Sequence, residues 1–203
     1  LSVNYGWTGR YFNSNTAPTR GWGIAVELGA GMTLRPERNP FTRTLVRWQS
    51  FFPAGRVEAD NGEARAARIS VRTEVGAVLA RGSAEIPVTQ LFLTGGDTTV
   101  RGYSYRSIGA RTQNNQLYGG RYMGVASVEW QRPITYRGNM TDWENTLFVD
   151  AGAVADRAGD LDPRVGVGTG VRWRSPVGPL QADLAWGVQS KQLRLHLRLG
   201  FTF

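Results

Sequence analysis

The most regular feature of the chain is an alternation of apolar and polar residues with a period of two. At the C-terminal end, apolar side chains occupy every second position over eleven residues, with Arg, His, Gly or Thr between them. The apolar set is Leu193, Leu195, Leu197, Leu199, Phe201 and Phe203. This pattern predicts a β-strand with two chemically different faces. Its length is what a tilted strand needs to cross a bilayer.

The same alternation recurs upstream and predicts nine strands in total. They are expected at about 1–12, 21–33, 43–53, 67–80, 120–132, 145–155, 165–174, 180–188 and 193–203. Helical periodicity is hard to find, and no window approaches the roughly 18 consecutive apolar residues of a transmembrane helix. We therefore predict an all-β fold, a transmembrane antiparallel β-barrel whose strands alternate between lipid and a watery lumen.

The charges agree with a lumen on the polar side of the strands. The net charge is +8, and Lys191 is the only lysine. An arginine that faces lipid at mid-bilayer costs roughly 2–4 kcal/mol, so Arg72, Arg172 and Arg198 are expected to face the lumen or lie near its rims. A basic chain can also bind nucleic acid, but these arginines form no basic run or helix, and we expect no nucleic-acid partner.

A water-soluble barrel with its apolar face inward is the competing all-β fold. The length of the strands and the frequency of Gly and Arg on the polar faces disfavour it. Catalysis is also disfavoured. The chain has no Cys and a single histidine, His196, with no Ser or Asp neighbour suggested by the sequence. We expect no enzyme activity, no metal site and no cofactor.

A long loop, predicted at about 81–117, interrupts the series of strands. A loop of this size in a compact domain tends to be functional. It contains Gly95-Gly96-Asp97, followed by Val100-Arg101-Gly102-Tyr103. Paired glycines followed by one arginine between small residues predict a tight turn that presents a single charge.

This loop carries a specific resemblance. The two segments resemble the Gly-Gly-Asp and Val-Arg-Gly-Tyr/Phe motif of the BamA/TamA superfamily of outer-membrane assembly factors, and within it most closely the TamA branch. Further matching segments follow in the same order, and the last residue is the Phe that the family pattern expects. They are Tyr105–Gly109, Ser127–Trp130, Phe148–Gly152 and Gly168–Pro179.

The resemblance implies that the loop folds back into the barrel. Its arginine, Arg101, would contact acidic residues of the inner wall, which correspond to Glu129 and Asp150 here. The alternation agrees with this, because Asp150 is out of phase with the apolar Val149 and Glu129 is out of phase with Val128. Charge-assisted hydrogen bonds would then join the loop to the wall.

The resemblance also implies a larger protein. Barrels of the superfamily have about sixteen strands, an even number as antiparallel closure requires, and soluble POTRA domains precede them. Five strands are predicted after the loop, as in the family, but only four before it. We expect residues 1–203 to be the C-terminal part of the barrel, without its N-terminal half or POTRA domains. The chain is then a fragment, or another chain completes the barrel.

The implied function is insertion of β-barrel proteins, autotransporter-type clients among them, through the seam strand Leu193–Phe203. The implied location is the bacterial outer membrane. The expected partners are outer-membrane lipid and lipopolysaccharide, client β-barrels and an inner-membrane-anchored periplasmic protein. Two alternatives stay open, a two-partner secretion pore and a passive anchor for a passenger domain. The Ser175–Pro179 turn and Gly95-Gly96-Asp97 favour the assembly factor.

Overall fold

Nine long strands form one antiparallel sheet in the computed structural model, which describes all residues except 15–16, 34–37, 82–83, 113, 176–177 and 201–203. The strands are β1 (Ser2–Phe12), β2 (Gly21–Met32), β3 (Pro40–Glu58), β4 (Ala64–Ala80), β7 (Tyr122–Tyr136), β8 (Asn139–Ala155), β9 (Arg164–Ser175), β10 (Gly178–Gly187) and β11 (Gln192–Leu199). Four precede the long loop and five follow it, which confirms the predicted all-β fold.

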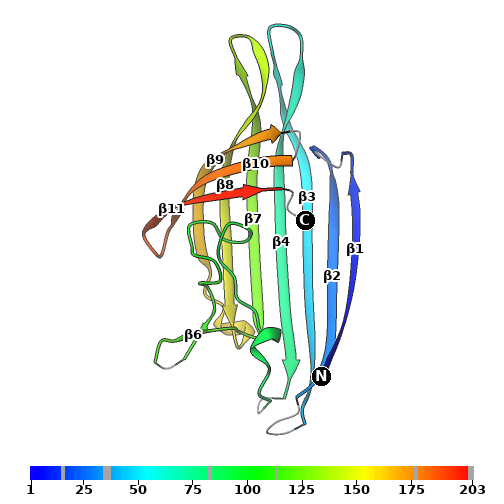
Figure 1. The fold of residues 1–203 in the computed structure, drawn as a ribbon, viewed down its shortest axis with the longest axis vertical. Helices are drawn as coiled ribbons and strands as arrows, with labels where there is room; N and C mark the ends of the chain where they lie inside the picture. The colour runs from blue at the N-terminus through cyan, green and yellow to red at the C-terminus, as the bar shows by residue number, and fades with distance from the viewer. Residues whose placement is uncertain (15–16, 34–37, 82–83, 113, 176–177, 201–203) are drawn as a thin grey trace.

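The sheet is a partial, unclosed barrel wall. Its strands pair in the order β1-β2-β3-β4-β7-β8-β9-β10-β11, so β1 and β11 lie at its two edges. Figure 1 shows the wall curving around the long loop, which lies on its concave side. Two short strands within the loop, β5 (Ala110–Arg111) and β6 (Leu117–Tyr118), form a separate pair. Short 3-10 turns lie at η1 (Val88–Gln90) and η2 (Ala158–Asp160).

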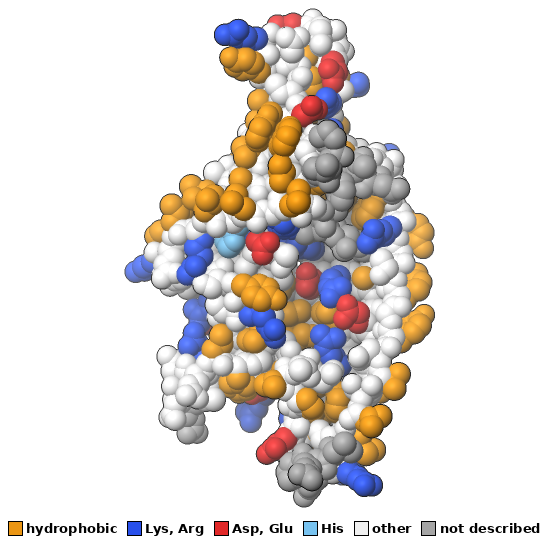
Figure 2. Space-filling view, viewed as in Figure 1, with side chains coloured by type: hydrophobic (Ala, Val, Ile, Leu, Met, Phe, Trp, Pro, Cys, Tyr) orange, Lys and Arg blue, Asp and Glu red, His pale blue; other side chains and the backbone are white. Residues whose placement is uncertain are grey.

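The two faces of the wall have the chemistry that the alternation predicts. In β8, Leu147 and Val149 are each 51% exposed on the convex face, whereas Phe148 and Asp150 are buried on the concave face. Charged side chains gather over the hollow of the wall, and hydrophobic side chains follow its outer edge (Figure 2). The convex face is therefore the one suited to lipid.

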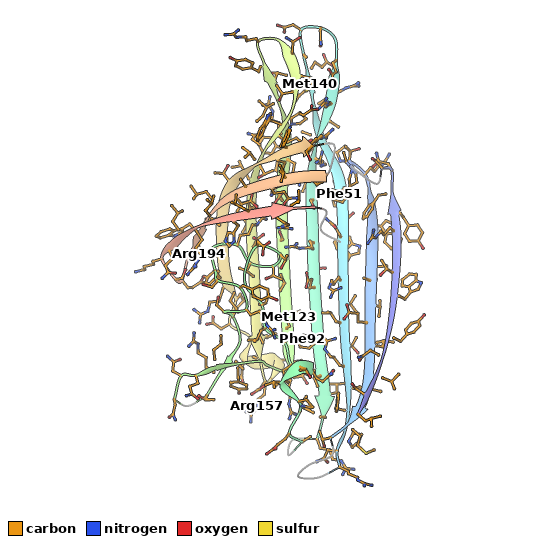
Figure 3. The ribbon with its side chains drawn as sticks, viewed as in Figure 1. Phe51, Phe92, Met123, Met140, Arg157 and Arg194 are labelled. Atoms are coloured by element: carbon orange, nitrogen blue, oxygen red, sulfur yellow. The ribbon has the colours of Figure 1, made fainter. Side chains whose placement is uncertain are left out.

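Part of the concave side is apolar, which the alternation did not predict. Phe92 and Val100 of the loop pack with Phe41, Met123 and Val125 of the wall in a buried hydrophobic cluster. Figure 3 shows Phe92 and Met123 close together at the end where the loop enters. The expected watery lumen is filled at this end, because the loop brings its own apolar side chains inside.

Two hairpins are longer than predicted. The pairing of β3 with β4 shifts register between Pro53 and Arg56, and the pairing of β7 with β8 shifts between Pro133 and Thr135. At the first shift, residues 54–55 of β3 lie opposite residue 67 of β4, and at the second, residue 134 of β7 lies opposite residues 141–143 of β8. These unequal lengths interrupt the regular pairing, so the alternation does not reveal the rest of each hairpin. The two hairpins project past the neighbouring strands (Figure 1) and are joined by a hydrogen bond from Asp60 N to Gly138 O of 2.8 Å.

None of the helices in the described residues is long and apolar enough to cross a membrane.

The lipid-facing assignment can be tested in the middle of β4. Val75 is 60% exposed on the convex face and pairs with Val46 and Gly124. In the full protein reconstituted in lipid, we expect Val75→Arg to lower the free energy of unfolding by roughly 2–4 kcal/mol, measured by denaturant titration. Glu74→Gln on the opposite face is the matched control, with a loss below about 1 kcal/mol. Equal losses would contradict the assignment.

Candidate functional site

The long loop is an ordered structure that folds on itself inside the wall. Phe92 and Gly120 exchange backbone hydrogen bonds, each of 2.9 Å, and Thr94 and Ile108 do the same. These bridges bring the two arms of the loop together and leave the segment between them as a hairpin-like tip. The tip contains all seven residues of the predicted loop motif.

Glycine backbone conformations shape the turn before the arginine. Gly95 and Gly96 have φ values of +105° and +109°, in a region that other residues rarely adopt. The Gly95 amide donates to Thr99 Oγ1 at 2.9 Å, and the Gly96 amide donates to Val100 O at 3.1 Å. This closed turn directs Val100, which is fully buried, and Arg101 toward the wall.

Arg101 makes a two-pronged contact with Asp150 on β8. Its Nε lies 2.7 Å from one carboxylate oxygen, and a terminal nitrogen lies 3.0 Å from the other. Its backbone amide also donates to Asp150, at 3.0 Å. A third nitrogen bonds Glu129 of β7 at 2.6 Å, and the guanidinium carbon lies 3.4 Å from the centroid of the Phe148 ring. The structure thus places Arg101 against both predicted acidic residues.

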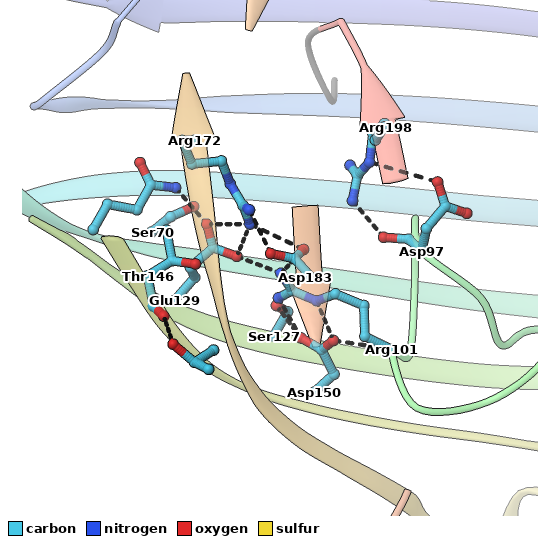
Figure 4. A network of polar contacts seen from close by, with 12 residues as sticks. Ser70, Asp97, Arg101, Ser127, Glu129, Thr146, Asp150, Arg172, Asp183 and Arg198 are labelled. Atoms are coloured by element: carbon cyan, nitrogen blue, oxygen red, sulfur yellow. Dashed lines mark hydrogen bonds and ion pairs between the residues drawn. The ribbon is translucent and has the colours of Figure 1, made fainter. Parts of the chain in front are cut away.

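Two further residues complete this group. Sequence reasoning predicted neither as a member of it, although it expected Arg172 to face the lumen or lie near its rims. Asp183 of β10 accepts a hydrogen bond of 2.9 Å from Arg101. Arg172 of β9 contacts the same Asp183 and lies 2.9 Å from Glu129. We call these five side chains the arginine cluster: Arg101, Arg172, Glu129, Asp150 and Asp183 (Figure 4).

Every member of the arginine cluster is buried. Two guanidinium groups face three carboxylates, so each charge has opposite charges beside it. Burial opposes the charged form of Arg101, but hydrogen bonding to Asp150 and the charges of Asp150, Glu129 and Asp183 outweigh it and raise the pKa of Arg101. Ser127 and Gln131 donate to Asp150 and Glu129, each at 2.6 Å, and help to satisfy the carboxylates.

The rest of the loop motif contacts the last two strands and the turn between them. The Gly102 amide donates to His196 Nε2 on β11 at 3.0 Å. Tyr103 accepts a hydrogen bond of 3.2 Å from the amide of Gln189, which lies between β10 and β11. Asp97 contacts Arg198 of β11. The motif therefore joins β7, β8, β10 and β11 through one short segment.

A second group of charged side chains, two of them buried, lies beside the arginine cluster. Glu144 of β8 accepts hydrogen bonds of 3.1 and 2.7 Å from Arg68 of β4, and it also contacts Arg174 of β9. All three residues occupy polar positions of the alternating pattern. The alternation alone therefore identifies these residues, and Asp183 and Arg172 as well, as residues of the concave face.

The predicted seam strand is only partly described. Four of its leucines lie on the exposed convex face of β11: Leu193, Leu195, Leu197 and Leu199. Phe201 and Phe203 lie outside the described residues, as do two positions of the Ser175–Pro179 turn. Among the described residues, no group of His, Cys, Asp or Glu side chains is arranged to hold a metal ion.

The model of the Omp85 superfamily domain matches residues 1–203. The chain belongs to the Omp85 superfamily. Barrels of this superfamily reside in the bacterial outer membrane, and this chain is located there. The matched domain is consistent with the nine-stranded sheet and its lipid-suited convex face.

Two known proteins are similar to this Omp85 chain. It is 31% identical over 114 residues to outer membrane protein assembly factor BamA of Nitratidesulfovibrio vulgaris, a match that covers 54% of this chain and 14% of that protein. The crystal structure of BamA from Haemophilus ducreyi lacking POTRA domains 1-3 has the same fold, with a TM-score of 0.67 and 20% identity. That match covers 98% of this chain and 40% of the other. The closer similarity to the TamA branch, expected from the loop motif, stays a prediction.

Close backbone approach offers a test of the docked loop. A Cβ on Gly166 of β9 would overlap the backbone oxygen of Arg101, whereas a Cβ on Gly124 of β7 would meet no atom within 4 Å. We expect Gly166→Ala to displace the loop and to lower the free energy of unfolding by about 1–3 kcal/mol. Gly124→Ala should change it by less than about 1 kcal/mol. Denaturant unfolding in lipid measures both, and equal effects would contradict the docking.

Proposed function

We propose that this Omp85 chain is the C-terminal barrel part of an assembly factor that inserts β-barrel clients into the outer membrane. In this proposal the N-terminal half of the barrel and the POTRA domains belong to the remainder of the protein. The observation that carries it is the loop tip, which is fixed through Arg101 to β7, β8 and β10 and lies directly against the edge strand β11.

The proposed mechanism uses the pairing groups of an edge strand. β11 pairs with β10 over eight positions, from Gln192 to Leu199. Unpaired N–H and C=O groups are costly in lipid, so a strand edge that becomes available at the seam gains free energy by pairing with an incoming strand. This is β-augmentation within a membrane. The client would leave as a barrel whose own strands pair with one another.

The mechanism needs no covalent chemistry. Strand pairing and burial of apolar surface supply the free energy, so the proposal requires no cofactor or nucleotide. The lipid-suited leucines of β11 keep this strand in contact with outer-membrane lipid and lipopolysaccharide throughout. The finer proposal, which rests on the resemblance of the loop motif, is a TamA-like factor that acts on autotransporter-type clients together with an inner-membrane-anchored periplasmic protein.

One observation favours a second candidate, a two-partner secretion pore. The lumen keeps a cavity of about 200 Å³ whose described lining includes seven arginines and two glutamates. A cavity with a charged lining of this kind suits translocation of a polypeptide. The loop tip nevertheless crosses the lumen and is held by several buried ion pairs, so passage of a chain would require its displacement.

Site-specific crosslinking to a client distinguishes the candidates. A photoreactive residue at Leu197 on β11 is expected to crosslink to a β-barrel client during assembly in cells. The same residue at Leu28, a comparably lipid-facing position on β2, is the matched control and should give little product. Equal crosslinking at both positions would contradict insertion at the seam. A large, stable single-channel conductance without client crosslinks at Leu197 would favour the pore.

A further inference from the structure

The edge strand β11 is attached to the rest of the molecule in an unusual way. It pairs only with β10 among the described strands. Its leucines point outward and are largely exposed, so they add little packing within the protein. Any further attachment therefore comes from the side chains on its concave face, which after Gln192 at its start are Arg194, His196 and Arg198.

Two of these three side chains reach the loop tip. His196 Nε2 accepts a hydrogen bond of 3.0 Å from the amide of Gly102. The Arg198 guanidinium contacts the backbone oxygen of Asp97, and its Nε lies 3.6 Å from the Asp97 carboxylate. Figure 4 shows Arg198 and Asp97 facing each other. Arg194 instead donates to Gln192 of its own strand, at 2.5 Å.

The backbone of Gly102 is built for this contact. Its φ is +91°, and a Cβ would lie 2.7 Å from the backbone nitrogen of Gly187 on β10. Only glycine therefore fits between the loop and the end of β10 while its amide points at His196. The bond also requires the neutral imidazole with its proton on Nδ1, because Nε2 acts as the acceptor.

The two contacts lie on either side of Arg101. Asp97 precedes it in the motif and Gly102 follows it, while Arg101 itself is held by Glu129, Asp150 and Asp183. The part of the loop that touches β11 is thus the part that is most firmly fixed to the wall. Because the loop tip is held in place by these ion pairs, its hydrogen bonds to β11 also restrict the position of that strand.

We infer that His196 and Arg198 are positioning residues that tie the edge strand β11 to the docked loop, so that the strand is released only when these contacts break. The inference rests on the proposed function, in which β11 meets the client. Because coupling between two sites is reciprocal, the docked loop stabilises β11 in its place, and β11 stabilises the docked loop to the same extent.

Hydrogen exchange tests the tie without a client. In the full protein in lipid bilayers, His196→Leu and Arg198→Gln are each expected to speed amide exchange in β11 by about 3- to 10-fold, the effect of losing one net hydrogen bond. Exchange in β2 should stay unchanged. His196→Gln, which keeps an acceptor near the position of Nε2, should restore most of the protection. Arg194→Gln is the matched control on the same face and should have no effect.

The unmodified protein provides a second measurement that does not depend on folding of a variant. The Gly102 amide should exchange as slowly as the paired amides of β11, although it lies in a loop. Fast exchange at Gly102 would overturn the inference, and so would unchanged β11 protection in the His196→Leu and Arg198→Gln variants.

Client assembly separates this inference from the proposed function. If the variants loosen β11 but assembly rates and crosslinks at Leu197 do not respond, the tie stands and insertion at β11 is wrong. If Leu197 crosslinks to clients while the variants leave β11 exchange unchanged, insertion at β11 stands and the tie is wrong. Faster β11 exchange together with altered assembly rates supports both.

Discussion

A guanidinium group buried inside a protein needs anionic partners around it, because it has lost the hydration that stabilises its charge in water. Arg101 meets this requirement with three carboxylates that come from three different strands. The requirement works in both directions, since the carboxylates need the arginine as much as it needs them. If the loop left the lumen, Arg101 and its carboxylate partners would lose their opposite charges at once. The docked position of the loop is therefore well defined.

The rest of the site follows from that one constraint. Once Arg101 is placed, Val100 lies in the apolar cluster, and Gly102 fits against the end of β10. Ser127, Gln131 and Arg172 add bonds that satisfy the remaining carboxylate oxygens. The lumen of this barrel wall therefore combines an apolar plug at the loop end with a charged layer above it. In such surroundings an ion pair is screened less than at a surface, and losing one partner is correspondingly costly.

Much of the fold could be predicted because lipid imposes a simple rule on every strand. Leu147 and Val149 face outward and Asp150 faces inward, as the period of two requires. The rule fails at the register shifts beyond Pro53 and Pro133, where one extra residue on β3 and two on β8 interrupt the regular pairing, and the ends of these two hairpins were not predicted. It also says nothing about the interior, so the apolar cluster around Phe92 was not foreseen.

The site was predictable only in part, for a related reason. Arg101, Glu129 and Asp150 were identified by the resemblance of the motif, and the alternation agreed with an inward direction for both acids. The alternation also places Asp183 and Arg172 on the inner face, but it does not tell how far along the barrel axis each side chain lies. Their meeting with Arg101 depends on the registers that join β7 to β8, β8 to β9 and β9 to β10. Those registers are long-range properties that a pattern of single residues does not contain.

The Arg101–Asp150 pair holds the loop to the wall. A double-mutant cycle tests it most directly, with Arg101→Ala, Asp150→Asn and the two combined, and with the free energy of unfolding in lipid as the measured quantity. We predict that each single change costs about 3–5 kcal/mol, and that the double variant costs at least about 2 kcal/mol less than the sum of the two. Additive losses would show that the two residues act independently and that their contact does not hold the loop.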